Sequence, residues 1–397
     1  MTAGTTRKKI TDNDLTRVKT ALLAKGYSYM AGSTHTFYHY PARFSPEIAH
    51  EVIDVFSKPG DWVLDPFMGG GTTVIEGLRL GRKVIGIDLN ALAHFVSTVR
   101  TTPLSSNDKE TLEKWALNAS LKLKNNETQR INSPKKNLPM TFQSFMDEAL
   151  QLTEKLRLPR QQAFARCVLL RLGQWALDGR EFSTIRRKVL SEKFSTFVNE
   201  MLDGLENFVE VVQLNKIKKS DISNQRVLLN RTAVGFHENP EIKGLKNRPT
   251  LVMTSPPYPG VHVLYHRWQY RGRKETDAPY WIANVNDGFC ESYYTGGSRT
   301  PTGETRYFRM ITGAFQSVRK VIAPSGLVVQ LVGFANTEKQ LPRYLEAMED
   351  AGFKEYIPSL EDSNRLGRQV PNRKWYARVS GKKTDASSEL LLFHRPS

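Results

Sequence analysis

The sequence predicts an α/β domain whose sheet is interrupted by a helical insertion. One observation is an apolar run at 61–67 that ends in a glycine cluster, followed by a helix candidate at 72–80 and a second apolar run at 83–89. Strand, glycine turn, helix and strand in this order are typical of a βαβ unit of a parallel sheet. Further apolar runs of strand length occur at 226–232, 250–256, 326–333 and 389–395.

Between the first two strands and the later ones, apolar residues recur at helical spacing. This pattern predicts a helical insertion in the sheet. One apolar stripe at helical spacing consists of Phe194, Val198, Met201, Leu205, Phe208 and Val212, and a second of Phe164, Val168, Leu172 and Trp175. Such stripes indicate buried core. We therefore expect three segments: residues 1–100, with a polar start and the first half of the α/β domain; a helical insertion at 101–225; and the second half at 226–397.

The composition restricts the class of protein. With 397 residues, 39% apolar and 24% charged, the chain is an ordinary globular protein that can bury a sizeable core. A net charge of +17 favours a polyanionic partner, most simply nucleic acid. No run of 18 apolar residues and no signal peptide is present, and the two cysteines, Cys167 and Cys290, fit a reducing cytosol. We expect a cytoplasmic protein without a membrane partner.

The glycine cluster follows the first strand directly and precedes the first helix of the βαβ unit. It comprises Asp65-Pro66-Phe67-Met68-Gly69-Gly70-Gly71-Thr72-Thr73. Glycines there let the backbone approach a ligand, and the helix N-terminus offers free N–H groups to an anion. Asp88 ends the next strand, where a carboxylate can accept hydrogen bonds from both ribose hydroxyls of a nucleoside cofactor. The loop lacks the Gly-Lys-Ser/Thr ending of ATP- and GTP-binding loops and the spacing of dinucleotide-binding loops.

A second motif follows a later strand. Thr254-Ser255-Pro256-Pro257-Tyr258 comes after an apolar run, and its two prolines end that strand. The carboxyl edge of a parallel sheet is where α/β proteins place their sites. We therefore expect a hydroxyl, a rigid Pro-Pro pair and an aromatic ring to be held together at this edge, beside the glycine loop.

The two motifs together resemble the S-adenosylmethionine-dependent DNA amino-methyltransferases, and the Ser form of the second most resembles the cytosine-N4 branch. The segment from Tyr40 to Pro46 resembles the family segment that holds the methionine part of the cofactor. The resemblance covers roughly 35–100 and 226–397 and implies a Rossmann-like methyltransferase sheet of seven strands, with helices on both faces and an antiparallel last strand. The implied cofactor-binding residues are Phe44, Ser45, Asp65, Pro66, Phe67, Gly69, Gly71, Thr72, Thr73, Asp88, Leu89 and Thr232.

The family often has an acidic residue at the end of the third strand, whereas this chain reads Leu229-Asn230-Arg231-Thr232. By resemblance, the catalytic residues are Ser255, Pro256, Pro257 and Tyr258. The Ser255 oxygen and the Pro256 carbonyl would accept hydrogen bonds from the target amine, and Tyr258 would stack on a base flipped out of the duplex. Methylation of a ring carbon would need a Pro-Cys pair, and neither cysteine follows a proline.

The expected partner is double-stranded DNA. Aromatic and basic residues alternate at 265–274, and the predicted DNA-binding residues there are Arg267, Arg271, Arg273 and Lys274. A basic stretch at 363–383 is a second candidate. His262 and His266 could mimic a metal pair, but no Glu or Cys completes a set, so we expect no metal.

The resulting hypothesis is a cytosine-N4 DNA methyltransferase, the modification enzyme of a restriction–modification system. It would share that system with a cognate restriction endonuclease without a stable complex, as a monomer or weak dimer. Adenine N6 as the target, an RNA methyltransferase, and a non-catalytic DNA-binding relative remain alternatives.

Overall fold

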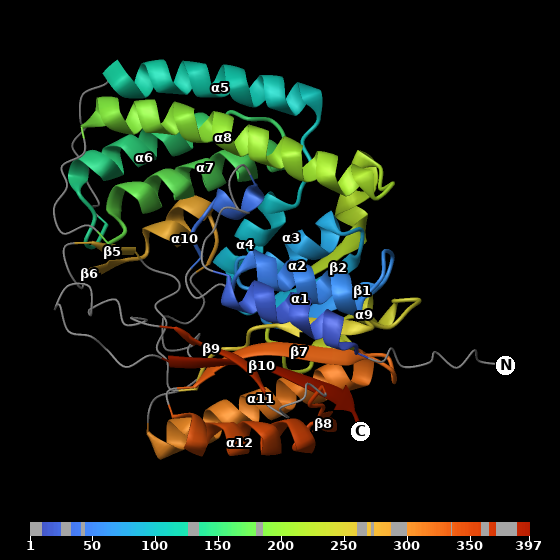
Figure 1. Cartoon of the computed structure of the whole chain (residues 1–397). Helices are drawn as coiled ribbons and strands as arrows, with labels where there is room; N and C mark the ends of the chain where they lie inside the picture. Colours follow the sequence, from blue (N-terminus) through green and yellow to red (C-terminus); the bar gives the residue numbers. More distant parts are fainter. Residues whose placement is uncertain are drawn as a thin grey trace.

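The computed structural model describes residues 10–24, 33–40, 44–125, 135–179, 186–259, 268–270, 274–286, 300–334, 336–358, 365–370 and 387–397. Most of them belong to one α/β body with an additional layer of helices (Figure 1). Figure 1 shows the central sheet between helices α11 and α12 on one side and α1 to α4 on the other, with the additional helices α5 to α8 beyond α3 and α4.

The sheet has eight strands, and every predicted strand is among them. Its order is β3-β2-β1-β4-β7-β10-β8, with β9 paired to β10. The first five are parallel, and β10 runs antiparallel to β7. The predicted α/β class, the Rossmann-like sheet and the antiparallel last strand are confirmed. The strands are β1 (Trp62–Asp65), β2 (Lys83–Asp88), β3 (Arg226–Asn230), β4 (Leu251–Thr254), β7 (Leu327–Phe334), β8 (Phe353–Glu355), β9 (Leu366–Val370) and β10 (Ser387–Pro396).

The sheet has one strand more than the expected seven, because two short outer strands, β8 and β9, both pair with β10. Strand β10 is ten residues long, and its outer edge pairs with β9 over Ser387–Leu391 and with β8 over His394–Pro396. Both outer strands are short and carry polar residues, so neither has the apolar run by which the sequence reveals a strand. Their pairing places Arg368 of β9 directly beside Glu389 of β10.

The sheet is covered on both faces because its strands alternate their side chains. Val63 packs into the cluster beneath α1 (Asp12–Leu23) and α2 (Pro46–Phe56), while the next residue, Leu64, packs beneath α11 (Pro301–Val321) and α12 (Thr337–Asp350). Helices α3 (Thr72–Arg79) and α4 (Ala91–Arg100) flank β2 on the same face as α2. The short helix α9 (Pro240–Lys243) follows β3.

The additional helical layer lies in the stretch where the sequence shows helical stripes. It consists of α5 (Ser106–Asn125), α6 (Met140–Thr153), α7 (Pro159–Leu177) and α8 (Arg187–Leu214). The stripe that begins at Phe194 is buried throughout, and its apolar cluster continues into α3 and α4. The layer and the sheet thus share a continuous core, and the division of the chain at 100 and 225 stays a prediction.

Two later elements rest on this layer. Strands β5 (Trp268–Tyr270) and β6 (Lys274–Thr276) form an antiparallel pair, and α10 (Ala278–Ala283) packs on α7. The Trp268 ring is buried against Gly173 of α7, where an added Cβ would lie 2.2 Å from the ring. Its indole N–H donates to the Tyr38 hydroxyl at 3.0 Å. The chain that follows the second motif is therefore anchored to the helical layer.

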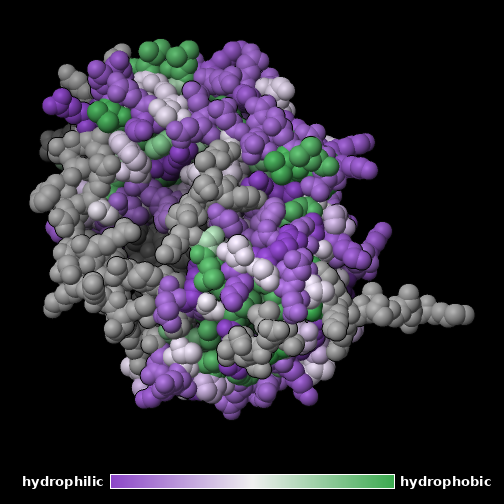
Figure 2. All heavy atoms as spheres, in the orientation of Figure 1, coloured by the Kyte–Doolittle hydropathy of each residue, from purple (hydrophilic) through white to green (hydrophobic). Residues whose placement is uncertain are grey.

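The outer surface of the described part is mostly hydrophilic, with separate small apolar areas on the face shown in Figure 2. No helix in the described ranges combines the length and the apolar character that a membrane crossing requires. Cys167 is a free, buried thiol in α7, and burial raises its pKa to about 12. Cys290, His262 and His266 lie outside the described residues.

Candidate active site

The two sequence motifs meet at one edge of the sheet. The glycine loop follows β1 and the Thr254–Tyr258 segment follows β4; these strands are parallel neighbours, so their carboxyl ends lie side by side. A hydrogen bond joins the motifs directly: the Thr254 hydroxyl donates to Oδ1 of Asp65 at 2.6 Å. The Thr73 hydroxyl, on α3, donates to the Met253 carbonyl at 3.1 Å. The sheet and these two bonds fix the motifs relative to each other.

The backbone of the glycine loop requires glycine at two positions. Gly69 and Gly71 have φ values of 50° and 85°, in the left-handed region that other residues rarely adopt. Gly71 is also the residue that begins helix α3, and a Cβ there would lie 2.7 Å from the Ser97 hydroxyl. Alanine could adopt the backbone conformation of Gly69 or Gly71 only with strain. The loop therefore places its N–H groups at the start of α3.

Asp88 at the end of β2 closes the loop. Its two carboxylate oxygens accept hydrogen bonds from the backbone N–H groups of Gly69 and Asn90, both at 2.8 Å. Burial raises the pKa of Asp88 to about 6, and the two N–H groups oppose this effect. The side chain is half-buried, and each oxygen of an ionised carboxylate can accept a second hydrogen bond. Asp88 thus presents acceptors at the strand end beside the loop.

Asp65 is the second carboxyl group of the site, and it is fully buried. Its Oδ1 accepts from Thr254 and from the Phe67 N–H at 3.1 Å. Its Oδ2 accepts no hydrogen bond of full geometry from the described residues. Burial raises the pKa of Asp65 to about 6, although the nearby Thr73 hydroxyl lowers the pKa of the carboxyl. An unpartnered buried oxygen is rare in native proteins, so Oδ2 is an acceptor that a bound donor could use.

The other predicted cofactor residues lie in four places. Leu89 lies at the loop, and its carbonyl accepts from the Asn230 side chain at 3.0 Å. Phe44 is buried in the cluster with α1 and α2, and Ser45 is the residue before α2. Thr232 is exposed after β3. Pro66 is buried and Phe67 half-buried directly after β1, and Thr72 is the buried first residue of α3. The cofactor roles of all of them stay predictions.

The segment after β4 is held by hydrogen bonds from three directions. The Ser255 hydroxyl donates to the Leu331 carbonyl of β7 at 2.9 Å. The Tyr258 hydroxyl donates to Oε1 of Glu389 at 2.9 Å, and its ring is buried. The Tyr307 hydroxyl of α11 donates to the Pro257 carbonyl at 2.8 Å. Pro256 is buried. The three hydrogen bonds hold the predicted catalytic residues, Ser255 to Tyr258, in one arrangement.

Arg100 supports the glycine loop, although neither sequence motif contains it. It lies at the end of α4, is 1% exposed, and donates to the backbone carbonyls of Gly70, His35 and Tyr38. Tyr40 also packs on the loop, 3.5 Å from the position of a Cβ on Gly69. The sequence does not reveal this role of Arg100, because its carbonyl partners belong to segments that only the fold brings together.

A buried carboxylate lies one turn behind the loop. Glu76 of α3 contacts Nε2 of His35 at 2.7 Å, Nδ1 of His50 at 2.9 Å and the Arg79 guanidinium at 3.4 Å. Burial by itself raises the pKa of Glu76, but the hydrogen bonds from His35 and His50 outweigh burial and bring it to about 2. Burial lowers the pKa of His35. These contacts join α3, α2 and the segment before α2.

We expect acid to weaken this cluster, and Glu76→Gln to remove the part of the acid sensitivity that comes from Glu76. In the unfolded chain Glu76 takes up a proton near pH 4.5, whereas in the folded protein its pKa is about 2. Its contribution to the free energy of unfolding is therefore complete above pH 4.5 and is lost as the pH falls towards 2. Urea unfolding of wild type and variant should show a difference that shrinks by about 3 kcal/mol over this interval. A constant difference would contradict the assignment.

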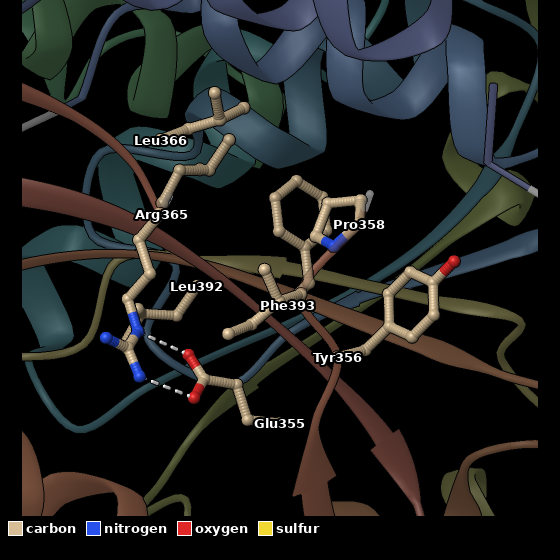
Figure 3. A pocket seen from close by; sticks show the side chains of 9 residues that line it. Glu355, Tyr356, Pro358, Arg365, Leu366, Leu392 and Phe393 are labelled. Atoms are coloured by element: carbon tan, nitrogen blue, oxygen red, sulfur yellow. Dashed lines mark hydrogen bonds and ion pairs between the residues drawn. The ribbon is translucent and has the colours of Figure 1, made fainter. Parts of the chain in front are cut away.

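The predicted DNA-binding residues are placed only in part. Lys274 is exposed at the start of β6, and Arg267, Arg271 and Arg273 lie outside the described residues. Of the basic stretch at 363–383, Arg365 forms a two-bonded ion pair with Glu355, at 2.6 and 2.8 Å (Figure 3). Arg368 pairs with Glu389 at 2.7 Å. These two arginines connect the outer strands of the sheet, so they are poorer candidates for phosphate contacts than the sequence indicated.

The pocket of Figure 3 lies at the gap between β8 and β9, along the outer edge of β10. Tyr356, Pro358 and Phe393 line its apolar side, and the Arg365–Glu355 pair closes one end. None of the predicted site residues lines it. Among the described residues, no group of three or more His, Cys, Asp or Glu side chains is arranged to hold a metal ion.

The first quarter of the chain is similar to known proteins. A family model described as "DNA methylase" (N6_N4_Mtase) matches residues 6–96, a stretch that contains the glycine loop and Asp88 but not Ser255. The chain is 43% identical over 74 residues to the type II methyltransferase M.MvaI of Kocuria varians, which is 18% of this chain and 16% of that protein. It is 30% identical over 90 residues to the type II methyltransferase M.MjaII of Methanocaldococcus jannaschii, 23% of this chain and 16% of that protein.

The matched stretches therefore span about a sixth of the length of these relatives. A crystal structure of TrmN from Thermus thermophilus aligns with 93% of this chain and 53% of that chain, at a TM-score of 0.33 and 9% identity.

Proposed function

We propose that this protein is a DNA amino-methyltransferase that uses S-adenosylmethionine and transfers the methyl group to N4 of a flipped-out cytosine. The observation that carries the proposal is the convergence of the glycine loop, Asp88 and Ser255–Tyr258 at one sheet edge, joined by the Thr254–Asp65 hydrogen bond. The "DNA methylase" match and the type II methyltransferase relatives support an amino-methyltransferase acting on DNA. The cytosine-N4 assignment rests on the Ser form of the second motif.

The loop residues fit the cofactor. Asp88 has acceptors for the ribose hydroxyls, and the glycines at 69 and 71 allow the tight, left-handed turn that carries the loop from β1 into α3. The unpartnered Oδ2 of Asp65 is suited to a cationic amino group such as that of the methionine part. When bound, S-adenosylmethionine supplies an electrophilic methyl group on a sulfonium sulfur. The role of the loop is to bind and orient this group.

The residues after β4 would hold the target amine. Because the Ser255 hydroxyl gives its proton to the Leu331 carbonyl, the lone pairs of its oxygen are left to accept hydrogen bonds. It would accept an N–H of the amine, with the Pro256 carbonyl as the second acceptor, and so localise the nitrogen lone pair. Most of the rate enhancement then comes from positioning the amine, since neutral Ser is a weak base. Tyr258 would contribute its ring as a stacking surface for the base.

Mass spectrometry of nucleosides tests the proposal. Unmethylated duplex DNA is incubated with the protein and isotopically labelled S-adenosylmethionine, then digested. We expect labelled N4-methylcytosine. Labelled N6-methyladenine would move the target to adenine, label only in an RNA substrate would move it to RNA, and tight cofactor binding without any transfer would indicate a non-catalytic relative. Sequencing of methylated positions after expression in an unmethylated host tests the link to a restriction system and names the recognition site.

The DNA surface is proposed to involve the helical insertion at 101–225, the 265–306 stretch, or both. The β5–β6 pair anchors this stretch to α7 through Trp268, and exposed Lys274 lies on it. Neutralising Lys274 together with Arg271 and Arg273 should flatten the salt dependence of DNA affinity. Each phosphate contact contributes about 0.9 log unit of affinity per log unit of salt. Fluorescence anisotropy at several salt concentrations measures the slope, and an unchanged slope would place the DNA surface elsewhere.

A further inference from the structure

We infer that Glu389 is a positioning residue that keeps the Tyr258 hydroxyl proton away from Ser255, so that the Ser255 oxygen stays open to accept the target amine. The inference rests on the proposed function. It assigns a role to a buried carboxylate that neither sequence motif contains. Glu389 lies on β10, 131 residues from Tyr258, and is 1% exposed.

Three side chains form the network. Oε1 of Glu389 accepts the Tyr258 hydroxyl at 2.9 Å, and Oε2 accepts Nε of Arg368 at 2.7 Å. Arg368 also donates to the Leu22 carbonyl, at the end of α1, at 3.1 Å. The carboxylate is thus paired and hydrogen-bonded on both oxygens, as a buried charge must be. The Tyr258 bond is made to a charged acceptor and is stronger than a bond to a neutral one.

The direction of each proton is what matters for Ser255. The oxygens of Ser255 and Tyr258 are 3.4 Å apart, close enough for one hydroxyl to donate to the other. Ser255 gives its proton to the Leu331 carbonyl, and Tyr258 gives its proton to Glu389. The Ser255 oxygen therefore receives no proton from Tyr258. Without Glu389, the Tyr258 proton can turn to the Ser255 oxygen 3.4 Å away, where it would occupy one of the two lone pairs and so compete with the target amine.

A purely structural role makes a different prediction. The Glu389–Arg368 pair also joins β9 to β10, and buried ion pairs of this kind can often be replaced by apolar residues without loss of stability. If the Glu389–Arg368 pair only holds β9 to β10, its removal should change the methylation rate equally whether or not residue 258 has a hydroxyl. The chain offers a matched control: Glu355 and Arg365 form the corresponding ion pair between β8 and the start of β9, away from Tyr258.

The test is a set of paired substitutions measured by single-turnover methylation at saturating cofactor and DNA. E389L/R368M replaces the pair with apolar residues, and E355L/R365M does the same at the control position. Each is made in wild type and in Tyr258→Phe. We expect E389L/R368M to lower the rate about three- to tenfold in wild type, the effect of one competing hydrogen bond. In Tyr258→Phe the same change should have no further effect, because the competing proton is gone. The control pair should leave both rates unchanged.

Thermal melts accompany every variant, and Glu389→Gln serves as a milder second variant: any loss it causes should likewise vanish in Tyr258→Phe. An equal loss in both backgrounds would overturn the role of Glu389 while leaving the proposed function intact. Wild type that transfers no methyl group to any amine would instead overturn the proposed function, and the role of Glu389 with it.

Discussion

Ser255→Ala should lower the single-turnover rate of methyl transfer by about 10- to 150-fold while cofactor affinity stays near that of wild type. The amine becomes positively charged as it reacts, and a hydrogen bond to a charged group contributes about 1.5–3 kcal/mol. This bond strengthens towards the transition state, so its loss lies in the chemical step. Rapid-quench measurements on saturated enzyme give the rate, and calorimetry gives the affinity.

The competing explanation is that the segment is only a strand-ending turn. In that case Ser255→Ala acts by removing the hydrogen bond to the Leu331 carbonyl, and the melting temperature and cofactor affinity fall together with the rate. Thr254→Val is a useful comparison, because it removes the hydroxyl that contacts Asp65 and leaves Ser255 in place. A folded Ser255→Ala protein with the wild-type single-turnover rate would refute the acceptor role.

Asp88→Ala should weaken binding of S-adenosylmethionine by about 1.5–3 kcal/mol, or roughly 10- to 150-fold. The substitution removes the acceptors for the ribose and also leaves the N–H groups of Gly69 and Asn90 without their partner. Isothermal titration calorimetry measures the affinity. Unchanged affinity in a folded Asp88→Ala protein would mean that the ribose is held elsewhere.

Asp88→Asn serves as the control, since it keeps one oxygen acceptor and the shape of the side chain. Asp88→Asn also identifies the part of the pH dependence of cofactor affinity that comes from Asp88. Burial raises the pKa of Asp88 to about 6, so the carboxylate gains a proton and loses acceptor capacity as the pH falls through that value. Wild-type affinity should therefore decrease between pH 7 and pH 5. The decrease should be smaller in Asp88→Asn, whose side chain does not titrate.

The network around Ser255 shows how the two motifs are held together. Asp65 and Thr254 connect the loop to the end of β4, and Leu331 of β7 orients the Ser255 hydroxyl. Each contact crosses between neighbouring strands of the sheet. The relative position of cofactor and amine would therefore be set by the rigid centre of the molecule, which is what in-line transfer requires.

The sequence by itself determined the parts of this protein that depend on local chemistry. Apolar runs of strand length located β1, β2, β3, β4, β7 and β10, and helical spacing located the buried stripe of α8. The glycine cluster after β1 and the two prolines after β4 marked the ends of strands. Parallel strands then bring those ends to one edge, so the meeting of the two motifs could be predicted without the structure.

Only the tertiary structure decided which distant residues complete the site. Arg100 reaches carbonyls of Gly70, His35 and Tyr38, Glu76 joins His35 and His50, and Glu389 meets Tyr258 across 131 residues. Strand β9 and its Arg368 become visible only through pairing with β10. A buried polar side chain is stable only beside its partner, and that partner is chosen by packing in space, which leaves no periodic trace along the chain.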